Sequence, residues 1–117
     1  MPRVRIAPGT WKYVLLQVED WSGKQALLVR NRAGKSYHAE MLEAARLELS
    51  TSGLKQLHVL GGGRIALDQA ARTLTVYGYS KTYGRCSACN QLAAELIRAA
   101  SVGGYRNFTV RWSNDGY

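Results

Sequence analysis

The chain has 117 residues, which is enough for one folded domain with a single core and too few for two. Apolar residues make up 46% of it and charged residues 21%, a globular composition that argues against a disordered chain. The net charge of +8 is typical either of a well-solvated basic surface or of a protein with anionic partners. Because the basic residues are scattered along the chain, the charge argues against a nucleic-acid surface and leaves a focused anion site open.

The first half of the chain predicts two strands followed by a helix. Residues 1–10 contain both prolines and a glycine and are expected to form an irregular lead-in. Aromatic and β-branched residues predict a strand over 11–18, and a turn at 21–24 leads to a second strand at 26–30. A helix is expected over 37–49, where good helix formers place apolar side chains on one side.

The second half predicts four more strands and the clearest helix of the chain. The strands are expected at 55–60, 64–67, 73–79 and 107–112, with a loop at Gly61-Gly62-Gly63 and another at 80–85. From Cys89 to Ala100 apolar residues recur at i, i+3, i+4, i+7, i+8 and i+11, which is the spacing of an amphipathic helix.

Together these elements predict an α/β fold in a single domain over residues 11–117. It would contain a mixed β-sheet of about six strands covered by two main helices, in the order β-β-α-β-β-β-α-β. No run approaches the roughly 18 apolar residues of a membrane span, and no apolar stretch follows Arg3 and Arg5 as a secretory signal would require. We therefore expect a soluble, cytoplasmic protein with no membrane contact.

His38 lies where a loop is expected to enter the first helix. Free backbone N–H groups at a helix start, here those of His38 and Ala39, bind phosphate through their hydrogen bonds and the helix dipole. An imidazole beside them could act as a base near neutral pH. From position alone, a helix residue with no catalytic role is the simpler interpretation of His38.

Gly61-Gly62-Gly63-Arg64 is a second candidate for anion binding. The glycines allow the backbone to approach a ligand closely, and the planar guanidinium of Arg64 suits phosphate oxygens. The segment is not a P-loop, because the G-x-x-x-x-G-K-[ST] spacing is missing. A glycine-rich hairpin turn with a solvated arginine is the simpler interpretation of this segment alone.

Cys86 and Cys89 are the only cysteines, three positions apart. A structural disulfide is not expected in a cytosolic protein. Cys89 falls on the apolar face of its helix and is interpreted as a core residue, whereas Cys86, beside Arg85, could be a modestly activated thiol. Neither cysteine has an arginine six positions later, so a cysteine-phosphatase loop is excluded.

The same cysteines raise one alternative from another enzyme class. His38-Ala39-Glu40 followed by Cys86-x-x-Cys89 has the form of the zinc deaminase signature, in which the His and both Cys would bind zinc. Arg85 stands where that signature has proline, and the gap between the two parts is expected to hold three strands. These departures count against a deaminase.

Five blocks of the chain resemble the Janus/Ocnus family of phosphohistidine phosphatases in order and approximate spacing. They are Trp11–Leu16, Tyr37–Glu40, Leu60–Ile65, Val76–Ser80 with Tyr83–Gly84, and Trp112–Tyr117. The resemblance runs from about residue 11 to the end. It is more specific than the match to the deaminase signature.

The resemblance implies hydrolysis of phosphohistidine on proteins, and possible action on phospholysine, without metal or cofactor. His38 would be the general base that activates water. Phosphate would be held by Lys12, Arg64, the N–H groups of His38 and Ala39, and the loop from Ser80 to Thr82; Arg30 would orient the substrate and Tyr37 would flank the site. We further expect a monomer that does not bind nucleic acid. A binding-only module for phosphorylated or acidic partners remains the third interpretation.

Overall fold

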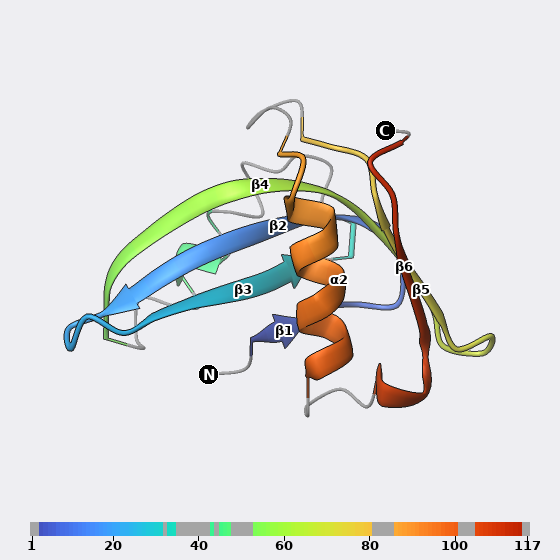
Figure 1. Cartoon of the computed structure of the whole chain (residues 1–117), viewed down its shortest axis with the longest axis horizontal. Coiled ribbons are helices and arrows are strands. Elements are labelled where there is room, and N and C mark those ends of the chain that lie inside the picture. Colours follow the sequence, from blue (N-terminus) through green and yellow to red (C-terminus); the bar gives the residue numbers. More distant parts are fainter. Residues whose placement is uncertain are drawn as a thin grey trace.

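Figure 1 shows a computed structural model of the chain. The structure describes residues 3–31, 33–34, 43, 45–47, 53–80, 86–100 and 105–115, with Arg106 described by its backbone alone. Within these ranges the predicted class is confirmed: six strands form one mixed sheet, and helical segments lie on it.

The sheet has the spatial order β1-β3-β2-β4-β5-β6. Its strands are β1 (Val4–Arg5), β2 (Gly9–Asp20), β3 (Gln25–Asn31), β4 (Leu54–Asp68), β5 (Thr73–Tyr77) and β6 (Thr109–Trp112). The four central strands pair antiparallel, whereas the edge strands β1 and β6 pair parallel with their neighbours. The long strands β2 and β4 arc across the whole molecule in Figure 1.

Helix α2 (Cys89–Ala99) lies across one face of the curved sheet, as Figure 1 shows. Its buried residues Ala93, Ala94 and Ile97 pack into a core with alternate residues of the strands, among them Tyr13 and Leu15. The short 3-10 helix η2 (Tyr105–Asn107) connects back to β6. The predicted helix over 89–100 is thus confirmed to within one residue.

The opposite face of the sheet carries a second core. Val14, Leu16, Val18 and Leu28 pack there against Ala45. Glu43 and residues 45–47 are helical and belong to the helix expected over 37–49, whose other residues lie outside the described ranges. Apolar residues on both faces explain why the middle of β2 is an unbroken apolar run, since each successive side chain points to the opposite side.

Two expectations are corrected at the level of single segments. Residues 1–10 are not wholly irregular, because β1 and the first two residues of β2 fall within them. Gly61-Gly62-Gly63 is not a loop: it lies buried inside β4, which runs unbroken from Leu54 to Asp68 and replaces two expected strands. The pairing of β2 with β4 shifts register by one step between Leu15 and Leu16, beside the glycines.

The glycines serve close packing within the sheet. A Cβ atom on Gly63 would collide with the carbonyl oxygen of Tyr77 and lie 3.1 Å from the carbonyl carbon of Gly78. One on Gly61 would lie 2.8 Å from Cβ of Cys86 and 2.9 Å from Sγ of Cys89. Glycine is therefore required here because β5 and the start of α2 approach β4 too closely for a side chain.

The turn between β2 and β3 is organised by Asp20. Its carboxylate accepts hydrogen bonds from the Ser22 hydroxyl at 2.6 Å, the Lys24 amide at 3.0 Å and the Ser22 amide at 2.9 Å. These bonds hold the pKa of Asp20 below its usual range. The predicted turn at 21–24 is confirmed, and it presents the exposed indole of Trp21 at its tip.

Asn90 joins three parts of the fold through one buried amide. Its oxygen accepts a hydrogen bond from the Tyr13 hydroxyl at 2.5 Å, and its nitrogen donates to the carbonyls of Gly78 at 2.9 Å and Ser113 at 2.8 Å. Burial raises the pKa of Tyr13, which keeps this hydroxyl protonated as a donor. Asn90 therefore fixes the start of α2 against β2, the end of β5 and the end of β6.

Replacing Asn90 by leucine keeps the size of the side chain but leaves the Tyr13 hydroxyl and two carbonyls without their partner. We expect the free energy of unfolding to fall by about 3 kcal/mol, since each buried group left unsatisfied costs about 1–3 kcal/mol. Urea denaturation measures this loss. Gln91→Leu, at the exposed neighbouring position, is the control and should change stability by less than about 0.5 kcal/mol. Equal effects of the two substitutions would contradict the role given to Asn90.

Gly63→Ala should lower stability by about 3 kcal/mol, because the obstacle is backbone rather than a movable side chain. Hydrogen exchange should speed up at the amides that join β4 to β5. Gly23→Ala is the control: it has φ +87° and no atom within 4 Å of the added carbon, so its effect should stay in the β2–β3 turn. Unchanged exchange in β5 of the Gly63 variant would disprove the close-packing explanation.

Candidate functional site

Lys12 and Arg64 lie directly opposite each other on β2 and β4. Paired residues in an antiparallel sheet share a face and have Cβ atoms about 4.5–5.5 Å apart. Both side chains are half-buried. Two cationic side chains held opposite each other on neighbouring strands can both contact one anion.

Arg30 adds a third cation on the same face. It pairs with Val14, which is two residues from Lys12 and therefore points the same way. Its guanidinium is buried, at 4% exposure, and donates to the carbonyl of Val29 at 3.0 Å. A buried guanidinium attracts an anion more strongly than an exposed one, because little water screens the charge. The register thus brings together three of the predicted binding residues on the face opposite α2.

Two features border this cationic face at the end of β5. Tyr77 lies opposite Arg64 and is half-buried. Beyond it, the Gly78 amide donates to the carbonyl of Asp115 at 3.2 Å, and the predicted residue Ser80 is fully buried. The end of β5 is therefore tied to the C-terminal segment, which positions the start of the expected Ser80–Thr82 loop.

Four predicted site residues lie outside the described ranges. They are His38, Tyr37, Ala39 and Thr82. Glu40, part of the alternative metal signature, also lies outside. The roles of these residues stay predictions. Lys12, Arg30, Arg64 and Ser80 have described positions, and their roles stay predictions too.

The cysteines differ from the expectation. Cys86 and Cys89 form a disulfide, with their Cα atoms 5.4 Å apart. The expectation of reduced thiols relied on the compartment, whereas the fold places both residues at the start of α2 within bonding reach. In this state neither sulfur offers a thiolate to a metal. Among the residues that the structure describes, no group of three or more His, Cys, Asp or Glu could hold a metal ion.

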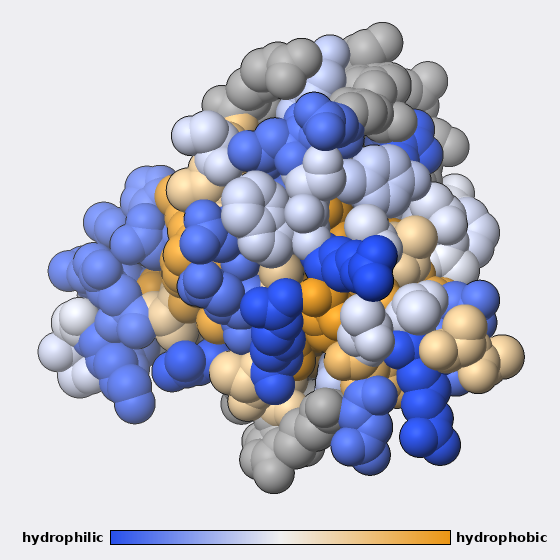
Figure 2. Space-filling view, turned by 45° about the vertical axis from the view of Figure 1, so that its right-hand side comes forward, coloured by the Kyte–Doolittle hydropathy of each residue, from blue (hydrophilic) through white to orange (hydrophobic). Residues whose placement is uncertain are grey.

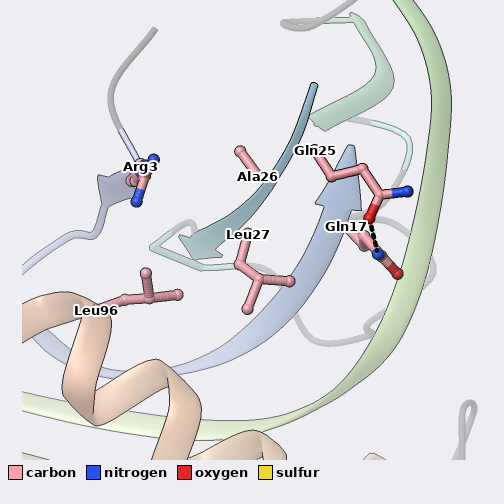
Figure 3. Close-up of a pocket in the computed structure, with 6 residues that line it drawn as sticks. All are labelled: Arg3, Gln17, Gln25, Ala26, Leu27 and Leu96. Carbon is pink, nitrogen blue, oxygen red and sulfur yellow. Dashed lines mark hydrogen bonds between the residues drawn. The ribbon is translucent and has the colours of Figure 1, made fainter. Parts of the chain in front are cut away.

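Two cavities among the residues that the structure describes have linings that include none of Lys12, Arg30 and Arg64. One, of about 370 Å³, lies near α2 and is lined by Arg3, Gln17, Gln25, Ala26, Leu27 and Leu96. Figure 3 shows the Gln17 amide turned toward Gln25, to which it donates a hydrogen bond of 3.2 Å. The other, of about 190 Å³, is lined by Gly78, Tyr79, Cys86, Ser87 and Asn114.

Hydrophilic side chains dominate the visible surface, as expected for a chain with the composition of a globular protein. Figure 2 shows mainly hydrophilic side chains on the face it presents, with apolar surface in smaller areas between them. Within the described ranges, no helix is long and apolar enough to cross a membrane.

Sequence reasoning missed the residues that position the site from within. Asn90 and Tyr13 fall within the predicted helix and strand, and no role of their own is predicted for them. Asn90 is a polar residue directly after Cys89, at the start of an otherwise apolar helix face. This pattern could have predicted a buried polar contact at Asn90. Asn114, which donates to the carbonyl of Ser87 at 3.1 Å, carried no signal apart from its place in the C-terminal block.

The model of the Janus/Ocnus family matches residues 1–108 of this chain. The chain belongs to the Janus/Ocnus family. This match includes residues ahead of Trp11, where the expected domain began, and it confirms the resemblance inferred from the sequence blocks.

Relatives within the Janus/Ocnus family carry two kinds of name. The 14 kDa phosphohistidine phosphatases of Sus scrofa and Homo sapiens are each 34% identical over 115 residues, which cover 93% of this chain and 86% of theirs. The sex-regulated protein janus-A of Drosophila melanogaster is 30% identical over 118 residues, covering 100% of this chain and 82% of its own. Membership therefore includes proteins named as phosphatases and proteins named otherwise.

Arg64→Ala should weaken binding of inorganic phosphate about 10- to 100-fold, since hydrogen bonds to charged groups contribute about 1.5–3 kcal/mol. Lys12→Ala should act in the same direction and less strongly, because an ammonium is a point charge and not a bidentate donor. Isothermal titration calorimetry measures both. Lys24→Ala removes an exposed cation of the β2–β3 turn and serves as control. An equal loss in all three variants would mean that only net charge matters.

Proposed function

We propose that this protein is a protein phosphohistidine phosphatase that hydrolyses the P–N bond without a metal ion. The observation that supports this most is the cationic face formed by Lys12, Arg64 and Arg30. The names of the relatives at 34% identity add the substrate class. Phospholysine, whose P–N bond is chemically similar, is the second substrate to test.

The three cations suit the charge of the substrate. A phosphoryl group on nitrogen carries about two negative charges, which spread further over its oxygens as the bond to nitrogen breaks. Arg64 supplies a planar bidentate donor, Lys12 a compact charge and Arg30 a desolvated one. Because the strands fix their backbone positions, these charges need little rearrangement during the reaction.

His38 is the proposed general base. It takes a proton from water as the water oxygen bonds to phosphorus, and the P–N bond breaks so that its electron pair returns to the substrate nitrogen. The protonated His38 then gives up its proton to the leaving side chain, so that the nitrogen is neutral again and the base is restored. The amides of His38 and Ala39 and the Ser80–Thr82 loop complete the phosphate site, and Tyr37 flanks it. The products are inorganic phosphate and the unmodified side chain.

The partners follow from the same chemistry. The proposed substrates are proteins that carry phosphohistidine. The enzyme is proposed to act on them as a monomer in the cytoplasm. No cofactor, nucleic acid or membrane takes part in the proposed reaction. The rival zinc deaminase needs Cys86 and Cys89 as thiolates, whereas they are bonded to each other here. Membership of the Janus/Ocnus family also argues against a deaminase.

A binding-only module is the second candidate, and the +8 charge favours it because charge alone could dock an acidic partner. Turnover distinguishes the two. A binding module would hold a phosphohistidine peptide and release no phosphate above the spontaneous rate.

His38→Ala should lower the rate of phosphate release from a phosphohistidine peptide about 10²- to 10⁴-fold, the usual contribution of a general base. The wild type should keep its rate in the presence of a chelator. His58→Ala, at an exposed position of β4, is the matched control and should leave the rate unchanged. Full activity in the His38 variant would rule it out as the base, and loss of wild-type activity with chelator would refute metal independence.

A further inference from the structure

The disulfide between Cys86 and Cys89 closes a very short loop. Only Ser87 and Ala88 lie between the two cysteines. A cross-link stabilises a fold by restricting the unfolded chain, and this effect is smallest for the shortest loops. Stabilisation of the fold is therefore a poor explanation for this bond.

The two cysteine residues differ in exposure. Cys89 is the first residue of α2 and is 1% exposed, packed in the core. Cys86 is half-buried and lines the cavity of about 190 Å³ with Gly78, Tyr79, Ser87 and Asn114. A thiolate from solution can therefore approach the Cys86 sulfur, whereas protein covers Cys89.

The start of α2 suits a sulfur that must leave as a thiolate. The helix has no acidic residue in its first turn, and its N-cap residue Ala88 makes no side-chain hydrogen bond. No carboxylate of the first turn therefore offsets the positive end of the helix dipole, and such an end stabilises an anionic sulfur.

Contacts other than the disulfide also hold the two cysteines near each other. The Cys89 amide donates to the Cys86 carbonyl at 3.2 Å, and Gly61 of β4 leaves the space that both side chains occupy. A reduced pair would stay within reach of each other, so the bond could form again without refolding.

We propose that Cys86 and Cys89 form a redox-active pair that exchanges with soluble dithiols. A thiolate of the dithiol attacks the Cys86 sulfur, a mixed disulfide forms, and the Cys89 sulfur leaves with the electron pair of the broken bond. The second thiol of the dithiol then attacks the dithiol's first sulfur, which is bonded to Cys86 in the mixed disulfide. The bond to Cys86 breaks, and Cys86 is released as a thiolate. Two electrons and two protons pass from the dithiol to the protein, and the dithiol becomes a disulfide.

This activity is separate from the proposed phosphatase reaction, and its test uses thiol chemistry alone. The folded wild type is equilibrated with mixtures of reduced and oxidised dithiothreitol, then alkylated and weighed by mass spectrometry. As the share of reduced dithiothreitol rises, both thiols should become open to alkylation together, in one reversible transition. The circular dichroism spectrum should stay that of the native protein throughout. Reduction that occurs only on unfolding, or a pair that never forms the bond, would overturn the proposal.

Single variants identify the sulfur that is attacked. With oxidised glutathione, folded Cys89→Ser should gain one glutathione on Cys86, and folded Cys86→Ser should gain none in the same time. Ser87→Ala, which keeps both cysteines, is the control and should undergo the same transition as the wild type. Faster labelling of Cys89 than of Cys86 would contradict the assigned order of attack.

Discussion

The antiparallel pairing of β2 with β4 is the constraint on which the rest of the structure depends. It sets Lys12 opposite Arg64 and, through Val14, aligns Arg30 on the same face. The same strands supply apolar residues to the cores on both sides of the sheet. A shift of one residue would exchange the two faces and move the cations into the core beneath α2. The fold and the candidate site thus rely on one register.

Close approach at the glycines links this pairing to the other elements. Because Gly63 has no side chain, the backbone at the end of β5 can lie close to β4. Gly61 leaves the corresponding space for the disulfide at the start of α2. Asn90 then ties that start to Tyr13 and to the carbonyls of Gly78 and Ser113. The segments on either side of the expected Ser80–Thr82 loop are therefore held by buried hydrogen bonds, which would give the loop a rigid frame for its proposed role in binding phosphate.

Elements that depend on the sequence of a single short segment could be predicted. The period of apolar residues located α2, and the Asp20 turn followed from its sequence. The glycine segment was misread because glycine usually ends a strand, and only the tertiary approach of β5 and α2 explains why β4 continues through it. The disulfide was missed because the prediction used the compartment, whereas the geometry of the chain decides which sulfurs meet. Lys12 and Arg64 were chosen by resemblance; that they face each other depends on a register that local sequence does not encode.

The most direct test of the account is an NMR titration of the ¹⁵N-labelled protein with inorganic phosphate. The account predicts the largest shifts at the amides of His38 and Ala39, around Ser80, and at the side-chain Nε of Arg64. Shifts centred instead on the opposite face, around Arg3, Leu27 and Leu96, would contradict it.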